Sequence, residues 1–225
     1  MSTDVNVLED RIEIKFEEFD PSVLNPDFLR YNRVVPKGWR LSDKPMCTEA
    51  FSTVEFEDFL RVHADGNGFT IDEKLAGKPR DKMMAPRVAQ ALVKRFPDRL
   101  SVGVVLTFRG HFAMDKQQVF DVLTNNVIAK GPWLKFHGNQ GIGAVRFSYP
   151  IGEDSVFQLT VEPGTLEMED KGMKPGLIVE GRFRRRVTGE SSEANLESAV
   201  NLIRNCKSDL RAWAKFVRAS FYPRS

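Results

Sequence analysis

The 225-residue sequence is poor in the residues that build metal centres and disulfide frameworks. It contains two cysteines, Cys47 and Cys206, and three histidines. Neither cysteine has a second cysteine or a histidine at metal-binding spacing, and no two histidines are arranged as in a zinc motif. A disulfide between the two distant cysteines stays open, but two unpaired, reduced thiols are the preferred interpretation. We expect neither a metal nor another cofactor.

Long apolar runs are also missing. A helix that crosses a bilayer takes about 18 consecutive apolar residues, and no segment of this chain approaches that length. The first 20 residues carry seven acidic and two basic side chains, which is the reverse of a secretory leader, and no apolar stretch follows them. These absences predict a cytoplasmic protein that does not enter the membrane.

The sequence carries no recognisable catalytic motif. No serine lies in a nucleophile elbow. The glycine-rich stretch 138–143 leads into a strand pattern, whereas a phosphate loop needs a helix N-terminus at that point. Asp65-Gly66-Asn67 begins like a calcium loop, but the fifth and twelfth positions of that loop are Phe69 and Ala76. The sequence favours a non-catalytic protein, although an enzyme assembled from distant residues stays open.

Charge, in contrast, is abundant and unevenly distributed. Charged residues make up 28% of the chain, with a net charge of +2. Residues 1–20 carry a net charge of −5, and residues 182–225 carry +6. This asymmetry indicates either a surface for a charged partner or pairing of the two ends within the fold.

The periodicity of the apolar residues predicts an α+β fold. Alternating apolar residues indicate strands near residues 11–17, 54–56, 60–62, 69–71, 101–108, 144–150, 155–162 and 176–187. Helical spacing indicates helices near 84–96, from Asp115 onward and over about 193–221. Asp65-Gly66-Asn67-Gly68 predicts a hairpin turn, and Asp115 with Gln118 predicts a capping box.

The order of these elements suggests two similar halves, residues 1–100 and residues 101–225. We expect two β-(α)-βββ-α halves that form a curved antiparallel sheet covered by helices, with a long C-terminal amphipathic helix. In one arrangement both halves build a continuous saddle-like sheet with pseudo-twofold symmetry. In the other, a bent sheet grips the C-terminal helix. The presence of two closing helices favours the first arrangement.

The strand expected at 177–187 is the most informative candidate for a binding surface. Alternation places Phe183 and Arg185 on one face and Arg182, Arg184 and Arg186 on the other. Three guanidinium groups along one strand face repel one another unless anions or carboxylates lie opposite them. We therefore predict that this basic patch binds a partner or an anion.

Two further groups of residues are candidates for binding a partner or a ligand. Arg211 and Lys215 lie in a basic stripe along the last helix, and we include them in the predicted partner- or anion-binding surface. Such a stripe is commonly just solvated surface. His111, at the end of the longest strand, and His137, before the glycine-rich stretch, are candidate ligand-binding residues. A lone histidine in either place is more often structural.

The leading hypothesis is a non-catalytic protein-interaction or accessory subunit of an intracellular complex, with a protein as its partner. The alternative is nucleic-acid binding through the arginine-lined strand. A sequence pI of about 8.5 is low for a dedicated nucleic-acid-binding protein, and Phe183 faces away from the arginines. A small-ligand binder or an enzyme built around His111 or His137 is the third hypothesis.

Overall fold

The computed structural model describes residues 5–57, 60–75, 78–79, 82–127, 135–136, 139–140, 143–168 and 172–221. The elements up to residue 93 are β1 (Asn6–Phe16), the 3₁₀ turn η1 (Pro21–Val23), α1 (Pro26–Tyr31), β2 (Met46–Cys47), β3 (Phe51–Phe56), β4 (Leu60–Asp65), β5 (Gly68–Lys74) and α2 (Ala85–Val93). The elements from residue 101 onward are β6 (Ser101–Ala113), α3 (Lys116–Val122), the π-helical turn η3 (Leu123–Val127), β7 (Lys135–Phe136), β8 (Asn139–Gln140), β9 (Val145–Gly152), β10 (Ser155–Met168), β11 (Gly172–Arg186), α4 (Ser192–Arg204) and α5 (Cys206–Phe221).

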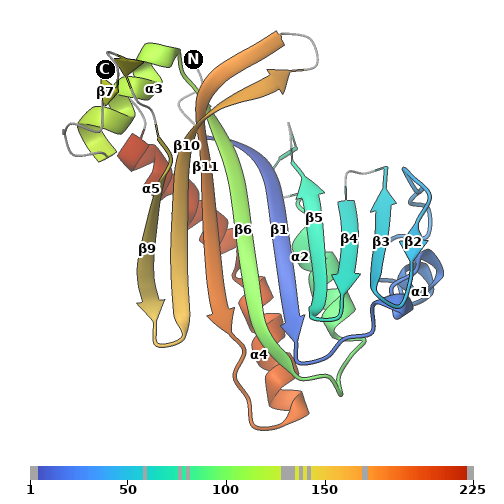
Figure 1. The fold of residues 1–225 in the computed structure, drawn as a ribbon. Coiled ribbons are helices and arrows are strands. Elements are labelled where there is room, and N and C mark those ends of the chain that lie inside the picture. The colour runs from blue at the N-terminus through green and yellow to red at the C-terminus, as the bar shows by residue number, and fades with distance from the viewer. Residues whose placement is uncertain are drawn as a thin grey trace.

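One large sheet organises the molecule. Within the described residues, nine strands pair antiparallel in the order β2-β3-β4-β5-β1-β6-β11-β10-β9, while β7 and β8 pair separately (Figure 1). At the centre, Ile12 of β1 lies opposite Ile71 of β5 on one side and Leu106 of β6 on the other. Leu106 in turn lies opposite Phe183 of β11. The predicted α+β class is confirmed, and strands from both 1–100 and 101–225 belong to this sheet.

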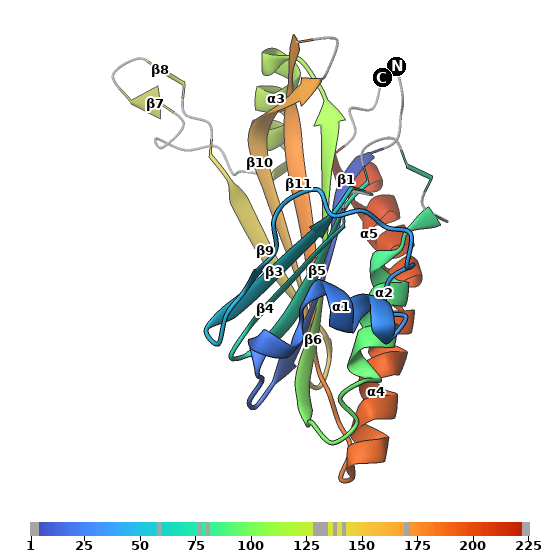
Figure 2. The ribbon, with the colours of Figure 1, turned by 90° about the vertical axis from the view of Figure 1, so that its right-hand side faces the viewer.

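The helices α2, α4 and α5 cover one side of the sheet, which we call the covered face; the opposite side, on which none of these three helices lies, is the open face. α2 packs on β1 and β5, α4 on β6, and α5 on β11. Figure 2 shows α2, α4 and α5 together on one side, and the outer strands at both ends of the sheet bending away from them. The open face is therefore concave. No helix within the described residues is both long enough and apolar enough to span a bilayer.

A single apolar core fills the space between the sheet and the helices. Its largest fully buried side chain is Trp213 of α5, whose ring centroid lies 5.9 Å from that of Phe108 on β6. The indole lies directly over Gly181 of β11, where any Cβ would collide with it. The glycine thus lets the helix approach the sheet closely.

Two local predictions are confirmed. The hairpin joins β4 to β5 at the predicted place, where Gly68 adopts a φ of +143° and the N–H of Asn67 donates to the carboxylate of Asp65 over 2.7 Å. At the start of α3, Asp115 and Gln118 form the predicted capping box, with both reciprocal hydrogen bonds present.

The C-terminal helix differs from the expected uninterrupted helix over 193–221, because Asn205 separates α4 from α5. The N–H of Asn205 donates to the carbonyls of Leu202 and Ile203, which tightens the last turn of α4. The hydroxyl of Ser208 donates to the Asn205 carbonyl. The apolar spacing continues through the interruption, so periodicity alone does not reveal it.

Candidate functional site

The arginines of β11 lie on the faces that alternation predicts. Arg182, Arg184 and Arg186 belong to the open face, whereas Phe183 and Arg185 point to the covered face. There, the Arg185 guanidinium donates to both carboxylate oxygens of Asp209 on α5, over 2.7 and 2.9 Å. This bidentate pair is largely shielded, with side-chain exposures of 14% and 13%. Arg185 therefore fastens α5 to the sheet and takes no part in the open surface.

Arg182 is balanced within the fold. Its Nη2 lies 3.2 Å from each carboxylate oxygen of Glu13, which reaches across from β1 over the intervening β6. Glu13 belongs to the acidic N-terminal segment. The uneven charge of the chain suggested either a surface for a charged partner or pairing of its two ends within the fold. For Arg182, the second interpretation holds.

Arg184 and Arg186 are exposed, and neither forms an ion pair with a described residue. Arg184 lies between Val105 of β6 and Val156 of β10 in the strand register. Arg186 lies opposite Gly103, whose other neighbour is Lys15 on β1. Of the three predicted arginines, Arg184 and Arg186 therefore remain available to bind a partner. Arg184 lies beside apolar side chains, and Arg186 lies beside a glycine.

Two further arginines of the open face are paired with carboxylates across strands. Arg61 on β4 binds the Glu55 carboxylate on β3 over 3.0 Å, and Arg11 on β1 forms an ion pair with Asp72 on β5. Arg109 on β6 has Glu180 of β11 and Glu9 of β1 as its register neighbours. The open face is consequently a surface of mixed charge.

The other two predicted residues lie on the opposite side of the molecule. Arg211 and Lys215 are exposed on α5, which packs behind β11. Figure 2 shows α5 on the side of the sheet away from the open face. The five predicted partner-binding residues therefore form two separate surfaces.

His111 lies inside the protein. Only 3% of its surface is exposed, and its Nε2 has no hydrogen-bond partner in the part of the chain that the structure describes. The ring packs so closely against Gly176 of β11 that a Cβ there would clash with it. Burial, and then the charge of Lys174, lower the pKa of His111, which favours the neutral ring. His137 lies outside the described residues.

A basic groove runs along α2 on the helix side, and periodicity did not predict it. Its volume is about 740 Å³, and it is lined by Lys82, Met83, Met84, Pro86, Arg87, Gln90, Ala91, Lys94, Arg95 and Lys207. Five of these residues are cationic, and none is acidic. The sequence signal was present, because Arg87 in α2 and Lys94 at its C-cap lie seven residues apart, and α2 contains no acidic residue.

Two buried carboxylates lie behind the start of this groove. Asp10 and Glu73 face each other across β1 and β5, and both are fully buried. Glu73 accepts the N–H groups of Met84 and Ala85 over 2.7 and 2.8 Å and so caps α2. The thiol of Cys206 lies 3.7 Å from Asp10. Burial first, and then the charge of Glu73, raise the pKa of Asp10 well above its usual value.

The thiol of Cys206 beside these carboxylates stays protonated. Burial, with the charge of Asp10, raises the pKa of the Cys206 thiol, and a protonated thiol is a poor nucleophile. Both cysteines are free, and Cys47 is exposed. Among the residues that the structure describes, no group of three or more histidine, cysteine, aspartate or glutamate side chains is placed to hold a metal ion.

Comparison with known proteins adds no assignment. No protein-family model matches the chain, and no curated protein matches its sequence.

Proposed function

We propose that the protein is a non-catalytic accessory subunit of a cytoplasmic complex that binds an acidic segment of a protein partner on its open face. The observation that carries this proposal is the position of Arg184, exposed between Val105 and Val156 and without a carboxylate partner among the described residues. An arginine set among apolar side chains is typical of the energetic centre of a protein interface.

The composition of the open face favours a protein over nucleic acid as its partner. Glu13, Asp72 and Glu180 lie on the same face as the arginines, and carboxylates repel a phosphate backbone. A protein surface can place opposite charges against both signs, and such complementarity selects the partner and speeds association. Arg186 and Lys15, which flank Gly103, extend the basic part of the face toward one end of the strands.

The two-halves organisation belongs to the same proposal. We infer that residues 1–100 and 101–225 are related units, each contributing one central strand to a shared docking face. In support, β1 pairs with β5, the last strand of its range, and β6 pairs with β11, the last strand of its own. β1 and β6 then pair with each other.

The test is a comparison of two charge-reversal variants that differ only in the face they alter. The full chain, as wild type, Arg184→Glu/Arg186→Glu and Arg211→Glu/Lys215→Glu, is used to purify partners from nuclease-treated lysate of cells that naturally make it. We expect one protein to be retained in near-stoichiometric amount by the wild type and the helix-face variant, and at least tenfold less by the open-face variant. Unchanged thermal unfolding checks that each variant folds.

Retention of the same protein by all three chains would contradict the proposal, because the open-face arginines would then contribute nothing to binding. Recovery of no protein by the wild type would contradict it as well.

A further inference from the structure

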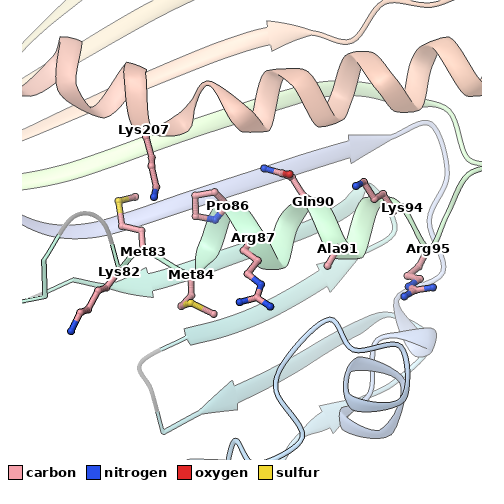
Figure 3. A pocket seen from close by; sticks show the side chains of 10 residues that line it. All are labelled: Lys82, Met83, Met84, Pro86, Arg87, Gln90, Ala91, Lys94, Arg95 and Lys207. Atoms are coloured by element: carbon pink, nitrogen blue, oxygen red, sulfur yellow. The ribbon is translucent and has the colours of Figure 1, made fainter.

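Several exposed cations lie on the outer side of the helices. Arg87 and Lys94 project from α2 into the basic groove, and neither forms an ion pair within the described residues. Figure 3 shows Lys207 reaching from α5 toward α2, while Gln90 and Lys94 point from α2 toward the neighbouring helix. The groove thus presents charge from two helices to the same space.

The basic surface continues from the groove along α5. Lys207, Arg211, Lys215 and Arg218 follow one another at intervals of four, four and three residues, and all four are exposed. They therefore share one side of the helix. The only acidic residue of α5 is Asp209, which forms an ion pair with Arg185. At 1.5 Å per residue, the stripe from Lys207 to Arg218 is about 16 Å long.

We propose that this surface, the basic groove together with the α5 stripe, binds the phosphate backbone of double-helical nucleic acid without sequence preference. A row of cations of this length matches a polymer of regularly spaced phosphates better than a single anion. Each phosphate that a lysine or arginine neutralises releases condensed counterions, and this release drives association. The inference is independent of the partner proposed for the open face.

The lining of the groove distinguishes a duplex from other polyanions. Its apolar residues are Met83, Met84, Pro86 and Ala91, and none of the described residues that line it is aromatic. Proteins that hold single strands use aromatic side chains on which unpaired bases stack. Protein–protein interfaces likewise rely on aromatic anchors, whereas interfaces with duplexes are more polar and more basic. The lining of the groove therefore resembles that of interfaces with double-helical nucleic acid.

The test uses the purified full chain and fluorescein-labelled DNA and RNA duplexes of about 20 base pairs and mixed sequence. Fluorescence anisotropy is followed from about 20 to 200 mM NaCl. We expect the association constant to fall steeply with salt, with a log–log slope near −4 for about four to five neutralised phosphates. Arg87→Gln/Lys94→Gln should weaken binding at least tenfold at about 50 mM salt and make the slope shallower by about 2.

The matched control is Arg184→Gln/Arg186→Gln, which removes the same charge from the open face. It should change the affinity by less than twofold. Equal losses in the two variants, or no binding of either duplex at about 20 mM salt, would overturn the proposal.

Two competitors identify the class of ligand. A single strand of the same length should bind no more tightly than the duplex, and polyglutamate of equal charge should compete at least tenfold less well. Preference for the single strand would overturn the assignment to a duplex, and equal competition by polyglutamate would point to an acidic protein in place of nucleic acid.

Discussion

The open face of the sheet and the outer side of the helices are both rich in cations, but they differ in how those cations are balanced. On the open face, carboxylates from other strands approach Arg11, Arg61 and Arg182. On the helix side, Arg87 and Lys94 have no carboxylate partner among the described residues. Strand register brings distant segments opposite one another, whereas an outward helix face is balanced mainly by its own sequence.

Two adjacent residues of β11 sharpen this comparison, because Arg184 and Arg185 point to opposite faces. Removing the Arg185 side chain leaves the shielded Asp209 carboxylate without its bidentate partner. We expect Arg185→Ala to lower the free energy of unfolding by about 3 kcal/mol. Arg184→Ala should lower it by about 0.5 kcal/mol or less. Urea unfolding of both variants measures the difference, and a gap below about 1 kcal/mol would refute the structural role of Arg185.

Asp10, buried between the two charged surfaces, should couple stability to pH. Its pKa is raised in the folded protein, so the folded state holds this proton more tightly than the unfolded state does. Stability contributed by the protonated group is therefore complete below the ordinary carboxyl pKa and is lost as pH rises toward the raised value. Between the ordinary carboxyl pKa and the raised pKa, the free energy of unfolding of the wild type should fall by up to about 1.4 kcal/mol per pH unit relative to that of Asp10→Asn.

The control for this titration is Asp98→Asn, which alters an exposed carboxylate. Its stability should follow that of the wild type across the same pH range, measured by denaturant unfolding at each pH. If the Asp10→Asn curve also runs parallel to that of the wild type, burial of Asp10 does not perturb its titration.

The smallest expected effect concerns the ion pairing of the open-face arginines. Glu13 and Arg184 both lie opposite Val105 in the register, yet Glu13 binds Arg182. A double-mutant cycle with Glu13→Ala and Arg182→Ala should give a coupling energy of about 0.5–1 kcal/mol, as for other partly exposed pairs. The parallel cycle with Arg184→Ala should give less than about 0.3 kcal/mol. A larger coupling to Arg184 would mean that this guanidinium is not available to a partner.

Predictions that depended on local pattern were the ones that succeeded. Alternation placed the β11 arginines on the correct faces, and the capping box at Asp115 is present. Both follow from interactions within a few residues of the chain. The pairing of Arg182 with Glu13 was beyond such patterns, because 169 residues separate the two side chains. Only the order of the strands in the sheet brings them together.

The groove on the helix side was missed for a related reason. It combines the segment before α2, the exposed side of α2 and Lys207 at the start of α5. Each part reads in the sequence as ordinary solvated charge. Their combination depends on how α2 lies beside α4 and α5, which periodicity does not specify. The interruption at Asn205 was hidden in the same way, since the apolar spacing passes through it.

The central claim, that the two charged surfaces bind different partners, can be tested by measuring lysine acetylation with and without bound duplex. Lys94, Lys207 and Lys215 report on the helix side, and Lys15 and Lys74 on the open face of the same molecule. With saturating duplex, we predict at least threefold slower acetylation of the first three lysines and no change in the other two. Equal protection of all five, or protection confined to Lys15 and Lys74, would contradict the separation of the two surfaces.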